Sequence, residues 1–398
     1  MKYDINLVMQ KYIDDGQIPN GILLVNQDNS RVFEGYWGYS DVEKHKPIQN
    51  DSIFRMMSMT KVVTAVMIMQ LHERGLLNID DPLEKYIPAF GGQRVVKEGT
   101  LKFSLNPIKL LFYVLTFNEK RIKTEPLGRA VTLRDLLSHS SGLQQGMAGL
   151  LMLRKDRKHP ADSLEKQVFR YAEEPLDFQP GAHTNYSPIA GFNVLGYVVE
   201  QVSGKRIEEF MQENICKPLG LKDTTFFLND EQKNRLVKVY DGKTGKLKDV
   251  SGTGKDLYGV LGMKEMAFEA ATGGLYSTAG EYEKIAIMLL NDGVCDSVRI
   301  LKKETVDMIH SEGARTHLVN EPGLVWGLGV KIRENPSEAD SFCTRGTYGW
   351  SGAFGTHIFI SPEDNLEAVF MTNRSDVDGA ASPISRKVEE MVFANWRK

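Results

Sequence analysis

The sequence predicts a protein of the α/β (α+β) class, in which an antiparallel sheet is flanked by helices and carries an inserted, mostly helical domain. Three observations lead to this prediction. Strand patterns occur near both ends of the chain, helical patterns dominate between about residues 80 and 255, and one helix is apolar on nearly every side. We therefore expect an α/β domain formed by residues 1–80 and 256–398, and a helical domain formed by residues 81–255.

The N-terminal elements follow from their periodicity. Residues 1–16 carry apolar side chains at the spacing of an amphipathic helix, and two strand-like runs follow at residues 21–25 and 31–39. The run at residues 62–69 is apolar almost all round, so its helix is expected to be buried on every side. Gly75 is a natural C-terminal stop for this helix.

The sequence predicts an insertion in the middle of the chain, at about residues 92–126. Its residues 108–117 are strongly apolar but too few to span a membrane, which takes about 20 residues. This stretch is interpreted as a packing helix, as a lid or wall of an apolar acyl pocket, or as a weak contact with a membrane surface.

The C-terminal part supplies the remaining strands and two helices. Thr278 and Glu281 are predicted to form a capping box for one helix. The strand patterns lie at residues 326–332, 356–361 and 366–372, and the last helix is expected at residues 382–396.

Ser58 and Lys61 are separated by three residues, so on a helical turn their side chains face the same way. A serine hydroxyl is a poor nucleophile until a base removes its proton, and a lysine amine at this spacing lies within reach. The position at the start of a buried helix holds the pair rigidly and favours developing negative charge. Chance matches to this spacing are common, and a capping serine is the structural alternative.

A second match, Ser163 and Lys166, follows Asp162 and opens a polar helical run. It is interpreted as a helix N-terminus with a capping serine or aspartate.

Two further segments contain candidate site residues in addition to Ser58 and Lys61. Tyr186 precedes Ser187 and Pro188, which fit the cap and first position of a helix that stops at Gly204. The tyrosine hydroxyl can therefore project into a cleft just outside a helix end. Much later, a glycine-rich segment at residues 348–356 leads into a strand, and its glycines allow close approach of backbone to a ligand, as expected of an edge strand.

With these three motifs in order, the sequence resembles the serine hydrolases of the class C β-lactamase and penicillin-binding protein superfamily, and within it the family VIII carboxylesterases. The segments at residues 75–82, 136–143 and 273–278 also resemble that family. The resemblance implies a β-lactamase-like fold and covers nearly the whole chain except the insertion.

The resemblance implies an acyl-enzyme mechanism. Ser58 would attack the carbonyl carbon, while Lys61 and Tyr186 accept and relay its proton, with no single base assigned. The backbone N–H groups of Ser58 and Ala353 would form the oxyanion hole. His139 is expected to have a structural hydrogen-bonding role.

Two departures bear on the substrate. The tyrosine motif ends in Pro188 instead of asparagine, and the third motif begins with Trp350 instead of lysine or histidine. Both changes remove polar recognition suited to penicillins or peptides. Trp350, Ser351 and Gly352 are the expected substrate-binding residues, although ordinary strand packing is the alternative for Trp350.

Composition fits a globular protein that acts on small molecules. The net charge of −3 gives no reason to expect nucleic acid, and the motifs require neither a metal nor an organic cofactor. The chain shows no export signal, so a cytoplasmic protein without a membrane span is expected.

The leading hypothesis is a serine carboxylesterase acting on short- to medium-chain esters. The alternatives are a β-lactamase or D-amino-acid peptidase, an acyltransferase, and a penicillin-binding sensor that acylates without turnover.

Overall fold

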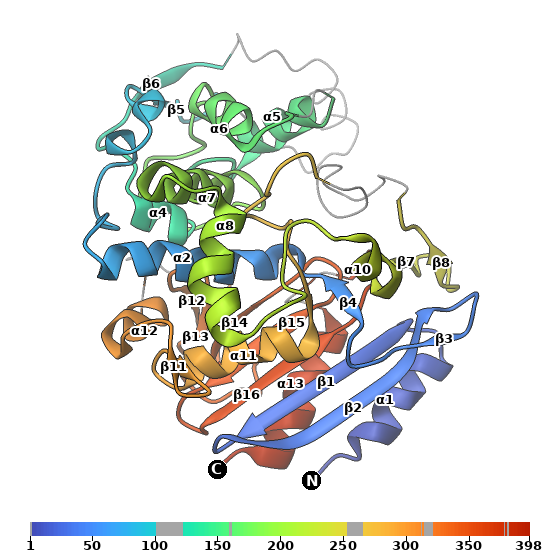
Figure 1. Cartoon of the computed structure of the whole chain (residues 1–398). Coiled ribbons are helices and arrows are strands. Elements are labelled where there is room, and N and C mark those ends of the chain that lie inside the picture. Colours follow the sequence, from blue (N-terminus) through green and yellow to red (C-terminus); the bar gives the residue numbers. More distant parts are fainter. Residues whose placement is uncertain are drawn as a thin grey trace.

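An eight-stranded antiparallel sheet, built from both ends of the chain, forms the centre of the structure (Figure 1). The computed structural model describes residues 2–100, 122–158, 161–252, 266–311, 313, 321–377, 379 and 382–398. Across the sheet the strands run in the order β12 (Leu324–Trp326), β13 (Lys331–Arg333), β14 (Tyr348–Ser351), β15 (His357–Ser361), β16 (Leu366–Met371), β1 (Asn20–Gln27), β2 (Ser30–Asp41) and β3 (Lys46–Pro47).

Helices cover both faces of this sheet, which confirms the predicted fold class (Figure 1). On one face, Ile22 and Leu24 of β1 belong to the same core as α2 (Thr60–Glu73) and α11 (Ala279–Leu290). On the other face, residues Leu23 and Val25 pack with α1 (Ile5–Asp14) and α13 (Pro383–Trp396). The alternation follows from the two-residue period of a strand.

Helix α2 is buried on all sides, as predicted from its apolar run. Its residues from Thr60 to Leu71 are all buried, and Gly75, with φ of +70°, follows the last turn. A buried helix of this kind holds whatever precedes it in a fixed position.

Two strand predictions need correction. Residues 326–332 form no single strand but a hairpin of β12 and β13, because Gly329 has φ of +80° and turns the chain between them. Trp326 therefore lies directly opposite Lys331. The segment at residues 348–356 begins in β14, which lies between β13 and β15 and is not an edge strand.

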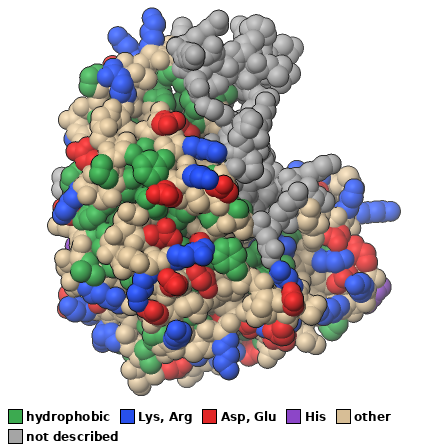
Figure 2. All heavy atoms as spheres, turned by 45° about the horizontal axis from the view of Figure 1, so that its top comes forward, with side chains coloured by type: hydrophobic (Ala, Val, Ile, Leu, Met, Phe, Trp, Pro, Cys, Tyr) green, Lys and Arg blue, Asp and Glu red, His purple; other side chains and the backbone are tan. Residues whose placement is uncertain are grey.

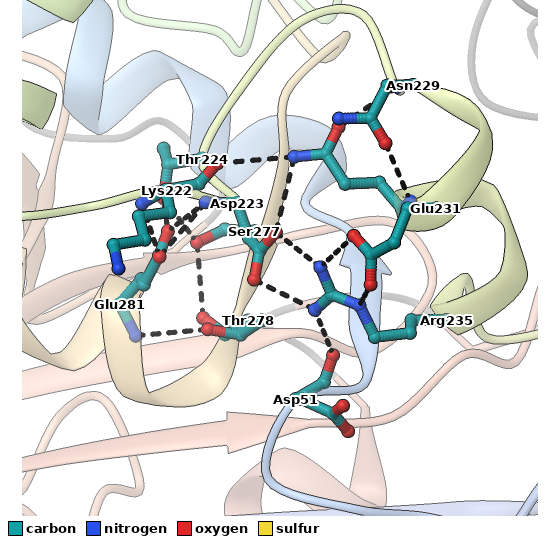
Figure 3. A network of polar contacts seen from close by, with 11 residues as sticks. Asp51, Lys222, Asp223, Thr224, Asn229, Glu231, Arg235, Ser277, Thr278 and Glu281 are labelled. Carbon is teal, nitrogen blue, oxygen red and sulfur yellow. Dashed lines mark hydrogen bonds and ion pairs between the residues drawn. The ribbon is translucent and has the colours of Figure 1, made fainter.

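The capping box predicted for α11 is half formed. Thr278 accepts a hydrogen bond from the Glu281 N–H, but the Glu281 carboxylate accepts hydrogen bonds from the backbone of Asp223 and the hydroxyl of Thr224 (Figure 3). Asp223 in turn pairs with Arg235 (Figure 3). The Glu281 carboxylate therefore holds the segment around Asp223 and Thr224 against the first turn of α11.

Most of the remaining helices lie between residues 81 and 252, and the division of the chain into two domains stays a prediction. They are α4 (Leu133–Leu137), α5 (Met147–Lys158), α6 (Leu164–Ala172), α7 (Ala190–Ser203), α8 (Ile207–Met211), α9 (Lys217–Leu219) and α10 (Asp230–Arg235), with α12 (Lys303–Ile309) outside this range. Short strand pairs are β4 (Ile53–Arg55) with β9 (Tyr276–Thr278), β5 (Arg94–Val96) with β6 (Thr124–Pro126), β7 (Tyr240–Asp241) with β8 (Lys248–Asp249), and β10 (Val294–Cys295) with β11 (Val298–Arg299).

The predicted insertion starts and ends at one small ribbon. Strands β5 and β6 pair near the two ends of residues 92–126, whereas the apolar stretch 108–117 lies outside the described residues. Ser163 caps α6 by accepting the Lys166 N–H, which confirms the interpretation of the second serine–lysine match.

Charges of both signs are interspersed on the surface drawn in Figure 2. Among the described residues, every helix is too short or too polar to cross a lipid bilayer.

Candidate active site

Ser58 lies in a 3₁₀ turn, Met57–Met59, directly before α2. The preceding residue, Met57, has φ of +51°, a conformation uncommon for any residue other than glycine. Two hydrogen bonds fix the backbone next to it, because the N–H of Met56 donates to Leu275 O (2.9 Å) and Thr356 Oγ1 donates to Met56 O (3.1 Å). The nucleophile candidate is therefore presented on a rigid, sharply turned backbone.

Gly352 packs against this turn. A Cβ atom at this position would lie 2.4 Å from Met56 O and 2.1 Å from Thr356 Oγ1, so only glycine fits. Gly352 does not contribute to the lining of the cavity beside Ser58, in contrast to Trp350, Ser351 and Ala353. Its place in the structure points to support of the Ser58 turn rather than to contact with substrate.

Lys61 is completely buried, and its amine points to three oxygen atoms. Nζ lies 2.9 Å from Pro188 O, 2.8 Å from Thr272 O and 3.3 Å from Ser58 Oγ. Burial lowers the pKa of Lys61 well below its ordinary value. A neutral amine has two N–H groups, which the two carbonyls can accept, and one lone pair, which is then available to the hydroxyl of Ser58.

The hydroxyl of Tyr186 donates to Ser58 Oγ at 2.7 Å. Its ring is held in an aromatic cluster, stacked on Trp326 with 5.8 Å between ring centres and beside Trp350 at 5.0 Å. His139 packs on the same ring at 4.8 Å, and its Nδ1 accepts the N–H of Ser187. The serine, lysine and tyrosine of the three-part prediction thus meet at one hydroxyl, and His139 has a structural position.

The helix after Tyr186 begins later than predicted. Helix α7 starts at Ala190, so Pro188 is not its first residue. The carbonyl of Pro188 accepts hydrogen bonds from Lys61 and from Thr272 Oγ1 (2.8 Å), which keeps it out of the helix. Ser187 still receives the N–H of Gly191 at 3.1 Å. Pro188 therefore contributes through its backbone, an effect that its side chain does not reveal.

A cavity of about 1110 Å³ opens at Ser58. Aromatic and apolar side chains form much of its wall: Met57, Phe178, Pro188, Leu324, Trp326, Phe342, Trp350, Ala353, Phe354 and Val377. The volume fits a small or medium organic molecule. Ser58 and Ala353 both line the cavity, while their joint role as an oxyanion hole stays a prediction.

The cavity also contains a cation that the sequence does not predict. Lys331 lines the cavity, with Nζ 5.4 Å from the ring centre of Trp326 and 5.0 Å from that of Trp350, and it pairs with Glu321. Burial lowers the pKa of Lys331, and Glu321 partly offsets this effect. The sequence predicts that Trp350 replaces a cation at this position, but Lys331 on the neighbouring strand β13 supplies a cation beside it. The glycines at 327 and 329 were the available signal, because a turn there brings Lys331 opposite Trp326.

The sequence profile of the Beta-lactamase family matches residues 5–388. The chain belongs to the Beta-lactamase family. Its fold and its relatives are those of the class C and penicillin-binding type of serine hydrolase within this family, as the three motifs had suggested.

The relatives of this chain differ in activity. It is 27% identical to the lovastatin esterase of Penicillium rubens, covering 91% of this chain and 90% of that protein. It is 25% identical to a putative D-alanyl-D-alanine carboxypeptidase of Escherichia coli (strain K12), covering 89% and 78%. The solved structure of EstCE1, a hydrolase with promiscuous acyltransferase activity, superimposes with a TM-score of 0.76 at 23% identity, covering 98% and 96% of the two chains. This last likeness concerns the fold.

Proposed function

We propose that the protein is a serine carboxylesterase that hydrolyses short- to medium-chain carboxylic esters through an acyl-enzyme on Ser58. The observation that carries the proposal is the meeting of Tyr186 OH and Lys61 Nζ at Ser58 Oγ, at the end of a largely apolar cavity. The esterase relatives support the same reaction class.

Lys61 is the proposed base. Its lowered pKa makes the neutral amine accessible, and the amine takes the Ser58 proton as Oγ attacks the ester carbonyl. The resulting ammonium is stabilised by the carbonyls of Pro188 and Thr272. Tyr186 then passes its proton to the departing alcohol oxygen and becomes a phenolate. In the second half of the reaction the phenolate takes a proton from the water that attacks the acyl carbonyl, and the Lys61 ammonium returns a proton to Ser58 Oγ as the acid leaves. The N–H groups of Ser58 and Ala353 are assigned to the oxyanion, where each is worth about a hundred- to thousandfold in rate.

The proposal is tested by steady-state hydrolysis of p-nitrophenyl esters of increasing chain length, with nitrocefin in parallel. We expect serine-dependent ester turnover, a loss of at least about a thousandfold in Ser58→Ala, and little nitrocefin hydrolysis. Wild-type rates in purified Ser58→Ala would reject the proposal. A stoichiometric burst without further turnover would instead favour a sensor, and product formation only with added alcohols or amines would favour an acyltransferase.

A second candidate is hydrolysis of an amide that carries a carboxylate, as in a β-lactam or a peptide ending in a D-amino acid. Lys331 favours this candidate because its ammonium lies beside Trp350, where a substrate carboxylate could pair with it. Nitrocefin turnover above ester turnover would make this the leading function.

A further inference from the structure

Four polar side chains form a continuous array along the wall of the Ser58 cavity. Ser351 Oγ lies 2.6 Å from His357 Nδ1, His357 Nε2 lies 3.0 Å from Glu389 Oε1, and Glu389 pairs with Arg333. All four line the cavity and all four are buried. They come from β14, β15, α13 and β13, so the array exists only in the folded protein.

The array has no part in the proposed chemistry at Ser58. A buried ionic array gives little stability compared with apolar side chains of the same size, because each charge loses its hydration. Its position on the wall of the cavity suggests a role in binding the substrate. Gly352, the neighbour of Ser351, packs directly on Met56 and Met57, which precede Ser58. Ser351 is therefore next to the contact that supports the nucleophile turn.

The hydrogen positions follow from the charges. Burial alone would raise the pKa of Glu389, but Arg333 and the hydrogen bond from His357 outweigh it and lower the pKa to about 2. Glu389 is therefore a carboxylate and can only accept, so His357 must carry its proton on Nε2. In the ring tautomer that carries its one proton on Nε2, Nδ1 is bare, so the Ser351 hydroxyl donates to Nδ1 and the remaining lone pairs of Oγ are left to accept.

We propose that the array formed by Arg333, Glu389 and His357 fixes Ser351 Oγ as a hydrogen-bond acceptor toward the cavity, so that esters carrying a hydroxyl or amide N–H are preferred substrates. This inference rests on the proposed esterase function and narrows its substrate class. Ser351 is then a specificity-determining residue, while His357 and Glu389 are positioning residues. A hydroxyl that forms a hydrogen bond at Ser351 gains about fivefold over one that cannot.

The first test concerns the ring of His357 and needs no substrate. Nitrogen NMR of histidine-labelled protein distinguishes a protonated from a bare ring nitrogen, and loss of one signal set in His357→Gln assigns the residue. We expect a protonated Nε2 and a bare Nδ1. The opposite tautomer, or a doubly protonated ring at neutral pH, overturns the inference whether or not the protein is an esterase.

The second test compares matched ester pairs. On the acyl side, p-nitrophenyl 2- and 3-hydroxybutyrate are each compared with their O-methyl ether, and on the alcohol side 2-hydroxyethyl butyrate with 2-methoxyethyl butyrate. We expect at least one pair to show a ratio of kcat/KM of about five in favour of the hydroxyl. Ser351→Ala should bring this ratio to about one, and Ser351→Thr should restore it.

Ser341→Ala is the matched control, because Ser341 lines the same cavity but is not one of the four residues of the array, and its hydroxyl accepts the N–H of Cys343. It should keep the hydroxyl preference. Ester turnover without preference in any pair, or equal loss of preference in Ser341→Ala, overturns the inference while leaving the esterase function in place. Absence of all ester turnover rejects the esterase function instead. The NMR result then tests, without a substrate, whether His357 is protonated on Nε2 alone.

Discussion

The amine of Lys331 lies 5.0 Å from the centre of the Trp350 ring, on the wall of the cavity that contains Ser58. Trp350 stands at the position where a lysine commonly begins the third motif. Lys331, on the adjacent strand β13, places a cation beside its indole ring. Its present partner, Glu321, has a side chain that is 46% exposed and can be displaced.

Substitution of Lys331 and substitution of Glu321 should have opposite effects on kcat/KM. For esters with a terminal carboxylate, such as p-nitrophenyl hydrogen glutarate, Lys331→Met should lower kcat/KM by about ten- to a hundredfold, because a charge-assisted hydrogen bond is lost. Glu321→Gln should raise it several-fold, because competition for Lys331 is removed. The uncharged p-nitrophenyl valerate serves as the reference, and equal effects on both esters would contradict the prediction.

The pH dependence of kcat/KM should report the low pKa of Lys61. The reactive form is the neutral amine, so kcat/KM should be low in acid, rise about tenfold per pH unit, and level off at a pH below the ordinary lysine pKa of 10.5. A pH series with an ester that is stable in alkali measures this. A rate that still climbs steeply above pH 10 would mean that Lys61 stays charged and is not the base at rest.

Glu389→Gln should weaken the fold and change its acid sensitivity. The carboxylate pKa is lowered from 4.5 to about 2, so its stabilising effect is complete above pH 4.5 and is lost as the pH falls from 4.5 to about 2. The variant leaves Arg333 buried without its counter-ion and should lose about 3–5 kcal/mol of unfolding free energy at pH 7. Urea unfolding at several pH values measures both effects.

Glu390→Gln provides the comparison for that experiment. Glu390 is the neighbour of Glu389 on α13, where it is partly exposed, pairs with Lys387 and accepts a hydrogen bond from the hydroxyl of Tyr3. We expect a loss of less than about 1 kcal/mol and little change in the acid transition. Equal losses in the two variants would show that the charge pair with Arg333 is not the cause.

Gly352→Ala should damage activity more than stability. The added methyl group would meet Met56 O and Thr356 Oγ1 at less than 2.5 Å, so the Ser58 turn must shift. A shift of this kind typically costs about a hundredfold in kcat, together with about 1–3 kcal/mol of stability. Gly280→Ala is the control, since nothing lies within 4 Å of its Cβ position in α11, and it should stabilise slightly. An active Gly352→Ala enzyme would mean that the turn tolerates displacement.

The elements that were predicted correctly depend on local patterns. The helix after Ser58 follows from a continuous apolar run, and β1 and β2 follow from two strand-like runs on either side of a turn. Ser58, Lys61 and Tyr186 were found because their motifs are short and occur in a fixed order. Each of these signals lies within a few residues of the chain.

The residues that were missed depend on pairing between distant segments. Ser351 and His357 lie opposite each other only because β14 and β15 pair in this register. Glu389 reaches them from a helix at the end of the chain, and Arg333 from β13. Lys331 escapes prediction for a related reason: the pattern of residues 326–332 predicts one strand, whereas a hairpin within it brings Lys331 to Trp326.

The contact of Gly352 with Met56 also limits how this site can evolve. Position 352 cannot gain a side chain without moving the nucleophile, so it is closed to mutational exploration. New substrate preferences must then arise at the nearby positions 350 and 351, because Trp350 and Ser351 both line the cavity. A library that varies these two positions and leaves 352 alone would sample specificity without rebuilding the catalytic turn.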